Sequence, residues 1–410
     1  MNTKIIKIFE YKKHLKLGCK INFMNTKKVF ISSGEASGDG YAALLINEIK
    51  NINSNIQIFG MGGKASQKSG MNLIVNSEKN ASIMGFFSIL TSLSKILKSL
   101  KTIKIWLKEN KPDAIILIDF PDFNFQIAKY AYKLRIPVYY FIPPQVWAWR
   151  KGRIKFLKKY INKMTVLYPF EERFYKENGV NNALFLGHPF VDEYENNFKL
   201  TDTEKRKKII SWGLDPKRPI VSIFPGSRKH EINNFLNLCI DVFKDLKNDD
   251  SSLQAVISVA PNVNKEELQS KILSFDTLKD IKIIKDDAIS VMQCSTAGLQ
   301  KSGTNNFQAC ICGLPFLMFY NASKVTEFFL KHFLTVKEFS IVNILRPHTV
   351  KEFLQEDLTK ENLAKELKRL LYDIEYRDNM IANFKEITRD FNFNKNLYTS
   401  KKIIKYFDLY

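Results

Sequence analysis

The residues best suited to proton chemistry lie at the end of an apolar run in the first half of the chain. Residues 114–118 are all apolar, and Asp119, Pro121, Asp122 and Asn124 follow them closely. A carboxylate at such a place can take a proton from a substrate hydroxyl group, as general bases do. The alternative is that one of the two aspartates only caps the helix expected to follow.

The apolar run 114–118 predicts a buried central strand of a parallel sheet, because it is bounded by Pro112 and Pro121 and carries no polar residue. Asp119 would then stand at the carboxyl end of this strand. Ligands of open α/β sheets bind at that edge, where the loops are held by the strands. This placement favours a role in binding or catalysis for Asp119.

A second acidic turn follows the first expected strand, residues 28–33. The segment Gly34-Glu-Ala-Ser-Gly-Asp39 leads from it into an expected helix. The segment does not match the G-x-G-x-x-G pattern of dinucleotide-binding turns, and the carboxylates of Glu35 and Asp39 would repel a phosphate. The turn therefore favours a polar sugar ligand or a catalytic carboxylate; the alternative is a plain turn with an aspartate cap.

Aromatic and basic residues follow a further expected strand, residues 138–142, in the loop Pro143-Pro-Gln-Val-Trp-Ala-Trp-Arg150. Two tryptophans and an arginine in a proline-led loop are poor core material. They suit stacking on a sugar ring or contact with an anionic group. His188, after the expected strand 183–186, is either a ligand contact or a structural histidine.

The second half of the chain contains two turns suited to phosphate groups. Pro225-Gly-Ser-Arg228 follows the expected strand 220–224, and Lys301-Ser-Gly-Thr304 follows a strand expected near Ala297. Each turn precedes an expected helix, so that backbone N–H groups, hydroxyl groups and cationic side chains are available to phosphate oxygens. The second turn is not a Walker loop, because the order of its residues differs.

Two α/β halves with such turns predict a cleft between them. The second half would hold a nucleotide-sugar donor, and the first half, with its carboxylates and aromatic residues, would activate an acceptor. The chain has no Asp-x-Asp sequence, so that a metal-bridged diphosphate is not indicated. The cationic turns and the helix dipoles would have to neutralise the leaving group instead.

The charge of the chain points to an anionic partner. Its 410 residues carry a net charge of +21, which suits nucleic acid, an acidic membrane surface or a phosphorylated substrate. Residues 82–108 predict a helix with an apolar stripe and a lysine stripe. This is either a helix at an anionic membrane surface, with Met84, Phe86 and Phe87 as contacts, or an ordinary helix packed on the sheet.

The length predicts two domains. We expect a basic leader at 1–26, an N-terminal domain at 27–195, a C-terminal domain at 205–391 and a helical tail at 392–410, with a polar linker at 194–208. No apolar run of about 18 residues is present, so that no transmembrane helix is predicted. The five cysteines lack the paired spacing of a zinc site.

Taken together, the motifs resemble the ordered set of the lipid-A-disaccharide synthase family over roughly residues 27–391. They are Gly34-Glu-Ala-Ser-Gly-Asp39, Ile118-Asp-Phe-Pro-Asp-Phe-Asn124, Gln145-Val-Trp-Ala-Trp-Arg150, Pro169-Phe-Glu171 with Phe174-Tyr175, Gly187-His-Pro189, Pro225-Gly-Ser-Arg228, Ser302-Gly-Thr304 and Glu352-Phe-Leu-Gln355. Each motif alone is weak, but so many in order are specific.

The resemblance implies an α/β protein of GT-B type, with two Rossmann-like doubly wound domains facing a cleft and no metal or other cofactor. Such an enzyme would transfer 2,3-diacylglucosamine from UDP-2,3-diacylglucosamine to the 6-hydroxyl of 2,3-diacylglucosamine 1-phosphate (lipid X). The product would be a β-1,6-linked disaccharide for lipid A and lipopolysaccharide, formed with inversion. The protein would be cytoplasmic and peripheral at the anionic inner face of the cytoplasmic membrane; a homodimer is left open, and nucleic acid is not an expected partner.

The resemblance also carries over to single residues. Asp119 matches the family's catalytic carboxylate and would act as general base, and Arg228 matches an arginine that binds the donor phosphates. The remaining expected substrate contacts are Glu35, Ser37, Asp39, Asn124, Trp147, Arg150, His188, Ser227, Ser302, Gly303, Thr304 and Gln308.

Three residues depart from the family pattern: Gln308 and Ser88 stand where glutamate is usual, and Ala42 where glycine is usual. An amide at 308 can still accept a hydrogen bond from a ribose hydroxyl, but without charge. Competing interpretations are another GT-B enzyme, such as a hexosaminyltransferase of peptidoglycan assembly or a sugar-nucleotide epimerase, and a basic protein that binds nucleic acid or membranes without catalysis. The last would be indifferent to Asp119→Ala and strongly salt-dependent.

Overall fold

The computed structural model describes residues 28–78, 89–226, 229–260, 263–264, 268–269, 280–285, 287–321, 338–391 and 398–409. The basic leader, the expected membrane contacts Met84, Phe86 and Phe87, and the pair Ser227-Arg228 lie outside the described residues.

The first sheet has seven strands in the order β3-β2-β1-β4-β5-β6-β7. They are β1 (Lys28–Ser33), β2 (Gln57–Gly62), β3 (Asn72–Asn76), β4 (Ala114–Ile118), β5 (Val138–Phe141), β6 (Lys163–Val166) and β7 (Ala183–Phe185). β1 pairs in parallel with β2 on one side and with β4 on the other, and Ser33 lies opposite Ile118 at the carboxyl ends. The strand order therefore reverses between β1 and β4, which is where open α/β sheets form a binding crevice.

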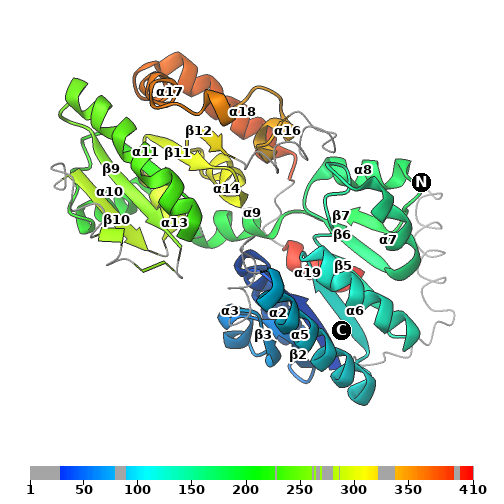
Figure 1. Cartoon of the computed structure of the whole chain (residues 1–410). Coiled ribbons are helices and arrows are strands. Elements are labelled where there is room, and N and C mark those ends of the chain that lie inside the picture. The colour runs from blue at the N-terminus through cyan, green and yellow to red at the C-terminus, as the bar shows by residue number, and fades with distance from the viewer. Residues whose placement is uncertain are drawn as a thin grey trace, which may run out of the picture. The chain divides into compact units, whose positions relative to one another are not determined.

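Helices surround this sheet because their apolar faces must be buried against it. They are α2 (Ala36–Ile52), α3 (Lys64–Lys68), α5 (Ile89–Asn110), α6 (Pro121–Lys133), α7 (Ile154–Tyr160), α8 (Pro169–Glu177) and α9 (Pro189–Glu193), with a short 3₁₀ turn at Lys151–Arg153. α5 packs on β3 and α6, and α2 packs on β1, β2 and β4 (Figure 1). Trp106 of α5 contacts Phe30 of β1 and Phe59 of β2, with ring centroids 5.4 and 5.0 Å apart.

The second sheet has six strands in the order β10-β9-β8-β11-β12-β13. They are β8 (Ile220–Phe224), β9 (Gln254–Val259), β10 (Ile281–Lys285), β11 (Ala297–Lys301), β12 (Phe316–Tyr320) and β13 (Glu352–Leu354). β8 and β11 are parallel neighbours, although β9 and β10 separate them in the chain. This sheet thus has its own reversal of strand order, between β8 and β11, and a second binding crevice is expected there.

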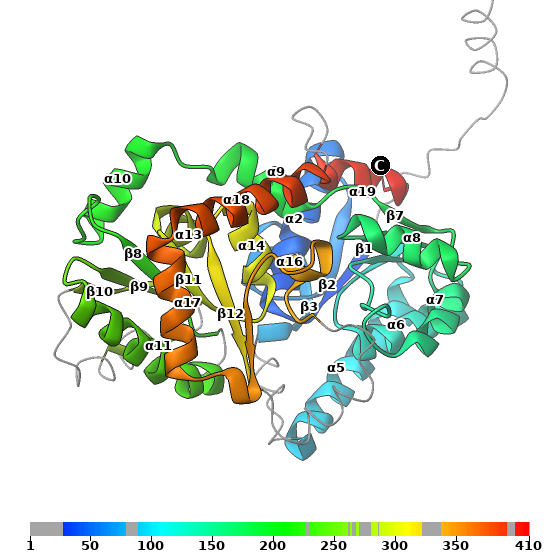
Figure 2. The same ribbon diagram turned by 90° about the horizontal axis from the view of Figure 1, so that it is seen from above.

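Helices also cover the second sheet. They are the π-helix Tyr194–Phe198, α10 (Asp202–Ser211), α11 (Lys229–Asp249), α13 (Ala288–Cys294), α14 (Thr304–Cys312), α16 (Ile341–Leu345), α17 (Lys360–Tyr372) and α18 (Ile374–Arg389). α17 lies beside α11 and packs on β11 and β12, and α18 follows it after a sharp bend (Figure 2). Leu363, Leu367 and Leu370 are the buried face of α17.

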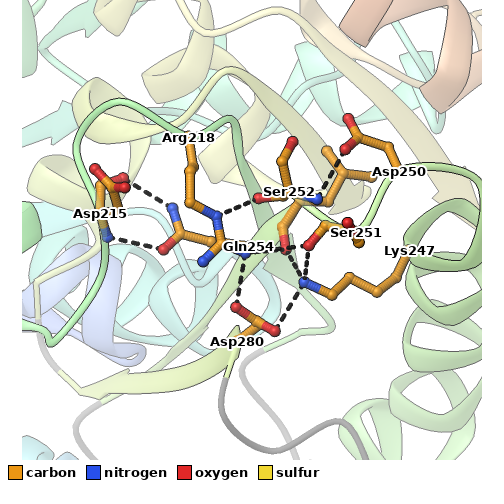
Figure 3. A network of polar contacts seen from close by, with 9 residues as sticks. Asp215, Arg218, Lys247, Asp250, Ser251, Ser252, Gln254 and Asp280 are labelled. Carbon is orange, nitrogen blue, oxygen red and sulfur yellow. Dashed lines mark hydrogen bonds and ion pairs between the residues drawn. The ribbon is translucent and has the colours of Figure 1, made fainter.

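A polar network holds the amino ends of β8, β9 and β10 together (Figure 3). Arg218 donates to the carbonyl oxygen of Ser252 at 2.6 Å and to a carboxylate oxygen of Asp280 at 2.8 Å. Lys247 reaches the other oxygen of Asp280 at 2.7 Å. These bonds pair the polar groups at the amino ends of the strands, and this edge of the sheet therefore stabilises the fold. The opposite edge, at the carboxyl ends, remains for ligands.

Contacts divide the chain into two units, of which one ends at Tyr139 and resumes at Ile403, while the other runs from Tyr140 to Lys402. α19 (Thr399–Tyr406) leads back into the first unit. There the ring of Phe407 stacks on Tyr139 at 4.9 Å, and Phe407 and Leu409 are buried. The end of the described chain therefore completes the core of the first unit.

The predicted α/β class with two parallel sheets is confirmed. The predicted domain boundaries stay predictions. The stretch 194–208, predicted to be a polar linker, is helical over most of its length, because Thr201 and Glu204 form a capping box that starts α10. Within the described residues, no helix is both long and apolar enough to span a bilayer.

Candidate active site

Asp119 lies in an unusual turn at the carboxyl end of β4. Asp119 and Phe120 both have positive φ, at 47° and 51°. Two consecutive non-glycine residues in this conformation cost energy and need support from their surroundings. Phe120 is the N-cap residue of α6, and no side-chain bond caps the helix from that position. The turn thus places Asp119 beyond the strand, and not in the N-cap position of α6.

Hydrogen bonds from the side chain of Asn124 hold this turn in place. Its side chain is fully buried, and its amide nitrogen donates to the carbonyl oxygens of Asp119 at 2.7 Å and Ile118 at 3.3 Å. Its oxygen accepts a bond from the hydroxyl of Ser32 at 2.7 Å. Asn124 therefore ties β1 to the end of β4 and positions Asp119. Its predicted direct contact with substrate stays a prediction.

Gly34 supports the same turn through the absence of a side chain. A Cβ atom at this position would lie 2.4 Å from Cγ of the Phe120 ring. Real carbon atoms do not approach so closely, so that the ring of Phe120 can lie against β1 only if residue 34 is glycine. The first acidic turn and the Asp119 turn thus fit each other.

The charge of Asp119 is tuned by its surroundings. Burial and the negative charge of Glu35 raise the pKa of Asp119 to about 6, although a hydrogen bond from the N–H of Phe120 lowers it. Burial and the charge of Asp119 in turn raise the pKa of Tyr41, in α2. Asp119, Glu35 and Tyr41 are therefore one electrostatic group. Sequence reasoning missed Tyr41, because a tyrosine inside a helix carries no motif.

The other residues of the first acidic turn have different surroundings. Asp39 is buried and accepts bonds from the N–H groups of Gly63 at 2.7 Å and Ala65 at 2.8 Å. It thus holds the start of α3 from within α2, and the alternative that it caps the helix following its own turn is wrong, because Glu35 is the N-cap residue of α2. Its predicted sugar contact stays a prediction. Ser37 is exposed at the start of α2, beside the half-buried Glu35.

The loop after β5 is held by its first tryptophan. The indole N–H of Trp147 donates to a carboxylate oxygen of Glu171 at 2.9 Å, and both side chains are buried. The expectation that both tryptophans are poor core material is therefore wrong for Trp147, because Glu171 satisfies its one polar atom. Burial raises the pKa of Glu171 to about 7, against the bonds from Trp147 and from the N–H groups of Tyr168 and Leu167.

Trp149 and Arg150 lie at the surface end of this loop. Trp149 is 41% exposed, and Arg150 is exposed. Of the two tryptophans, only this one has a ring that a ligand can reach. The prediction of a substrate contact by Arg150 fits its placement, and that by Trp147 would require a rearrangement of the buried pair.

His188 is buried against aromatic rings. Its Nδ1 accepts a bond from the N–H of Phe190 at 3.2 Å and so caps α9, and its ring lies 4.6 Å from that of Phe307. Burial lowers the pKa of His188 to about 3, so that it is neutral at physiological pH. These contacts support the structural alternative, and a ligand contact stays a prediction.

An ion pair lies beside the turns that follow β8 and β11, where the second binding crevice is expected. Lys301, at the end of β11, contacts Glu231 of α11 at 2.8 Å, and both side chains are largely buried. Gly226, after β8, has a φ of 125°, and a Cβ there would lie 2.6 Å from Glu231. The turns that follow β8 and β11 thus both contact Glu231 of α11, as expected if they line one binding crevice.

The turn 301–304 presents polar groups around the start of α14. Asn306 accepts a bond from the N–H of Gly303 at 3.3 Å and donates to Gln300 at 3.2 Å. Gly303 and Thr304 are exposed, and Ser302 and Gln308 are half-buried. The hydroxyl groups and the N-terminus of α14 suit an anion. The described residues bring Ser302, Gly303 and Thr304 together, with Gln308 one turn further along the helix.

The part of the chain that the structure describes contains no group of three or more His, Cys, Asp or Glu that could hold a metal ion. That the protein needs no metal or cofactor stays a prediction.

Comparison with known proteins identifies close relatives. The family model described as lipid-A-disaccharide synthetase matches residues 29–403. A lipid-A-disaccharide synthase of Coxiella burnetii is 32% identical over 88% of this chain and 93% of its own length, and one of Koribacter versatilis is 33% identical over 88% and 92%. The fold is similar to that of UDP-GlcNAc 2-epimerase from Neisseria meningitidis, with a TM-score of 0.64 and 14% identity over 92% of this chain and 98% of that one.

Gly34→Ala tests the packing of the two turns. The new methyl group must displace the Phe120 ring, so that we expect a loss of about 1–3 kcal/mol of unfolding free energy in urea denaturation. Gly40→Ala is the matched control, because a Cβ at that position of α2 meets nothing within 4 Å. It should be stabilising by about 0.5–1 kcal/mol. Equal effects of the two substitutions would contradict the proposed fit.

Proposed function

The chain belongs to the lipid-A-disaccharide synthase family, and from this premise we propose that Asp119 is the general base of its glycosyl transfer. As a member of the family, the protein is a hexosyltransferase that condenses UDP-2,3-diacylglucosamine with 2,3-diacylglucosamine 1-phosphate to the β-1,6-linked lipid A disaccharide 1-phosphate and UDP. The 6-hydroxyl oxygen of the acceptor forms a bond to the anomeric carbon of the donor, and the bond from that carbon to UDP breaks. The hydroxyl proton must pass to a base.

The proposal rests on the surroundings of Asp119, which fix its position and raise its pKa. The carboxylate follows β4 at the reversal of strand order, in a turn that Asn124 and Gly34 fix. With a pKa of about 6 it is mostly ionised at pH 7, yet it is a stronger base than an ordinary carboxylate. Glu35, whose charge contributes to this pKa, is placed to tune the base.

We propose that the turn 301–304 and the start of α14 bind the diphosphate of the donor. The hydroxyl groups of Ser302 and Thr304 and the N-terminus of α14 suit phosphate oxygens, and Lys301 adds a cation that Glu231 holds in place. Ser227 and Arg228, next to Gly226 in the sequence, would contribute from the β8 side. These cations would neutralise the leaving UDP without a metal ion, for which the chain offers no Asp-x-Asp ligand pair.

We also propose that the protein associates with the anionic inner face of the cytoplasmic membrane, where both lipid substrates reside. α5 supports this: Leu97 and Ile105 are 55% and 47% exposed, and they line a groove of about 590 Å³ against α6 together with Lys101 and Lys104. Exposed apolar side chains among lysines suit an interface with anionic lipid. A homodimer stays a prediction.

Asp119→Asn tests the general base. The amide keeps the size of the side chain but cannot take a proton, so that we expect kcat to fall about a thousandfold, measured as disaccharide formed by mass spectrometry. The matched control is Asp122→Asn, an exposed aspartate of the same turn, which should keep most of the activity. A chelator should leave the wild-type rate unchanged. Activity of Asp119→Asn within tenfold of wild type would sink the assignment.

The pH profile tests the electrostatic group. Asp119 must be ionised to accept a proton, so that kcat/KM should be constant above about pH 6 and fall as the pH drops below it. Glu35→Gln removes a negative charge that raises this pKa, and the acidic limb should move to lower pH. Glu48→Gln is the control, because Glu48 lies in α2 thirteen residues after Glu35 and about 20 Å from it. It should leave the acidic limb of the profile in place. If Glu35→Gln also left the limb in place, Glu35 would not influence the pKa of Asp119.

Vesicle binding tests the membrane face. Leu97→Ser with Ile105→Ser should weaken binding to vesicles that contain an anionic phospholipid, since each change removes exposed apolar surface. Ile210→Ser with Ile374→Ser is the control, because these isoleucines are 61% and 62% exposed in the second unit. Equal loss in both pairs would show that general surface hydrophobicity, and not this face, determines binding.

A further inference from the structure

A cationic aromatic surface lies at the end of the loop that follows β5. The guanidinium carbon of Arg150 is 4.2 Å from the centroid of the Trp149 ring, and that of Arg153 is 5.3 Å from it. Trp149 is 41% exposed, and Arg150 and Lys151, which follow it, are exposed as well. We call Trp149, Arg150 and Arg153 the Trp149 platform.

The platform is held in place by buried contacts beneath it. Trp147 is bonded to Glu171, and the hydroxyl of Tyr175 donates to the carbonyl oxygen of Pro144 at 3.0 Å, both within the second unit. Arg150 itself has a φ of 54°, in the left-handed region that a long side chain seldom adopts. A costly backbone conformation on a rigid support points to a function for the side chain that it orients.

The chemistry of the platform fits a phosphate group. A guanidinium group that stacks on a ring through its flat face keeps its N–H edge in the plane, where it can donate two parallel bonds to phosphate oxygens. A phosphate monoester, with about −1.5 to −2 charges near pH 7, would accept bonds from both guanidinium groups at this ring.

We propose that the Trp149 platform binds the 1-phosphate of the acceptor and thereby selects phosphorylated over unphosphorylated acceptors. This rests on the proposed function. The platform follows β5, a strand of the sheet whose turns carry the carboxylates, whereas the turns assigned to the donor diphosphate belong to the other sheet. Of the phosphates in the reaction, the monoester of the acceptor is therefore the one left for these arginines.

The test compares two acceptors, 2,3-diacylglucosamine 1-phosphate and the same diacylglucosamine without its phosphate. Their equilibrium affinities in mixed micelles and their KM values are measured for wild type and for Arg150→Gln with Arg153→Gln. We expect the double variant to bind the phosphorylated acceptor at least tenfold more weakly and the unphosphorylated one about as well as wild type. KM should follow the affinity, while kcat changes little.

The matched control is Lys155→Gln with Lys159→Gln, which removes the same charge from exposed positions of α7. It should retain the preference for phosphate, and Trp149→Phe, which keeps a ring, should retain more of it than Trp149→Ala. An equal loss for both acceptors, or an equal loss in the lysine control, would overturn the proposal. Affinity is measured without turnover. If the protein discriminates between the acceptors but forms no disaccharide, the proposed reaction is refuted, while phosphate binding by the Trp149 platform is still supported.

Discussion

The hydrogen bonds of one buried amide support the turn that carries Asp119. The side chain of Asn124 joins the hydroxyl of Ser32 in β1 to the carbonyl oxygen of Asp119. A buried amide is costly unless its groups are paired, and here the pairing is supplied by the two strands between which the sheet reverses its order. The turn with two left-handed residues persists because these bonds and the fit of Phe120 on Gly34 compensate for its strain.

In the second sheet, the residues that stabilise the fold and those suited to bind a ligand lie at opposite edges. At the amino ends of β8 to β10, Arg218 and Lys247 both donate to Asp280 and to nearby carbonyl oxygens, so that the polar groups of this edge are paired within the protein. At the carboxyl end of β11 the turn 301–304 places the hydroxyl groups of Ser302 and Thr304 at the start of α14. The first sheet places its carboxylates at the equivalent edge. Under the proposed function, the phosphates of the donor would bind at the polar turn of the second sheet, and the acceptor would lose its proton at the carboxylates of the first.

The sequence allowed the architecture and the position of Asp119 to be predicted, because long apolar strands and the turns after them are local signals. It did not reveal what each polar side chain binds. Trp147 was expected at a ligand and is buried on Glu171, since only the fold brings the helix α8 beneath the loop. Asp39 accepts a hydrogen bond at the start of α3, and the charge of Asp119 contributes to the raised pKa of Tyr41. Such pairings depend on residues distant in the chain, and their roles toward substrates cannot be inferred from spacing.

The helix α19 has a consequence for how the protein is made. Phe407 stacks on Tyr139, and the whole second sheet is encoded between these two residues. During synthesis the first unit, with Asp119 already in it, would wait without its last helix until the ribosome has produced the rest of the chain. Its apolar surface around Tyr139 would be open to chaperones during that time. The core of the first unit would then be completed only after residues 140–402, which encode the whole second sheet, have been synthesised.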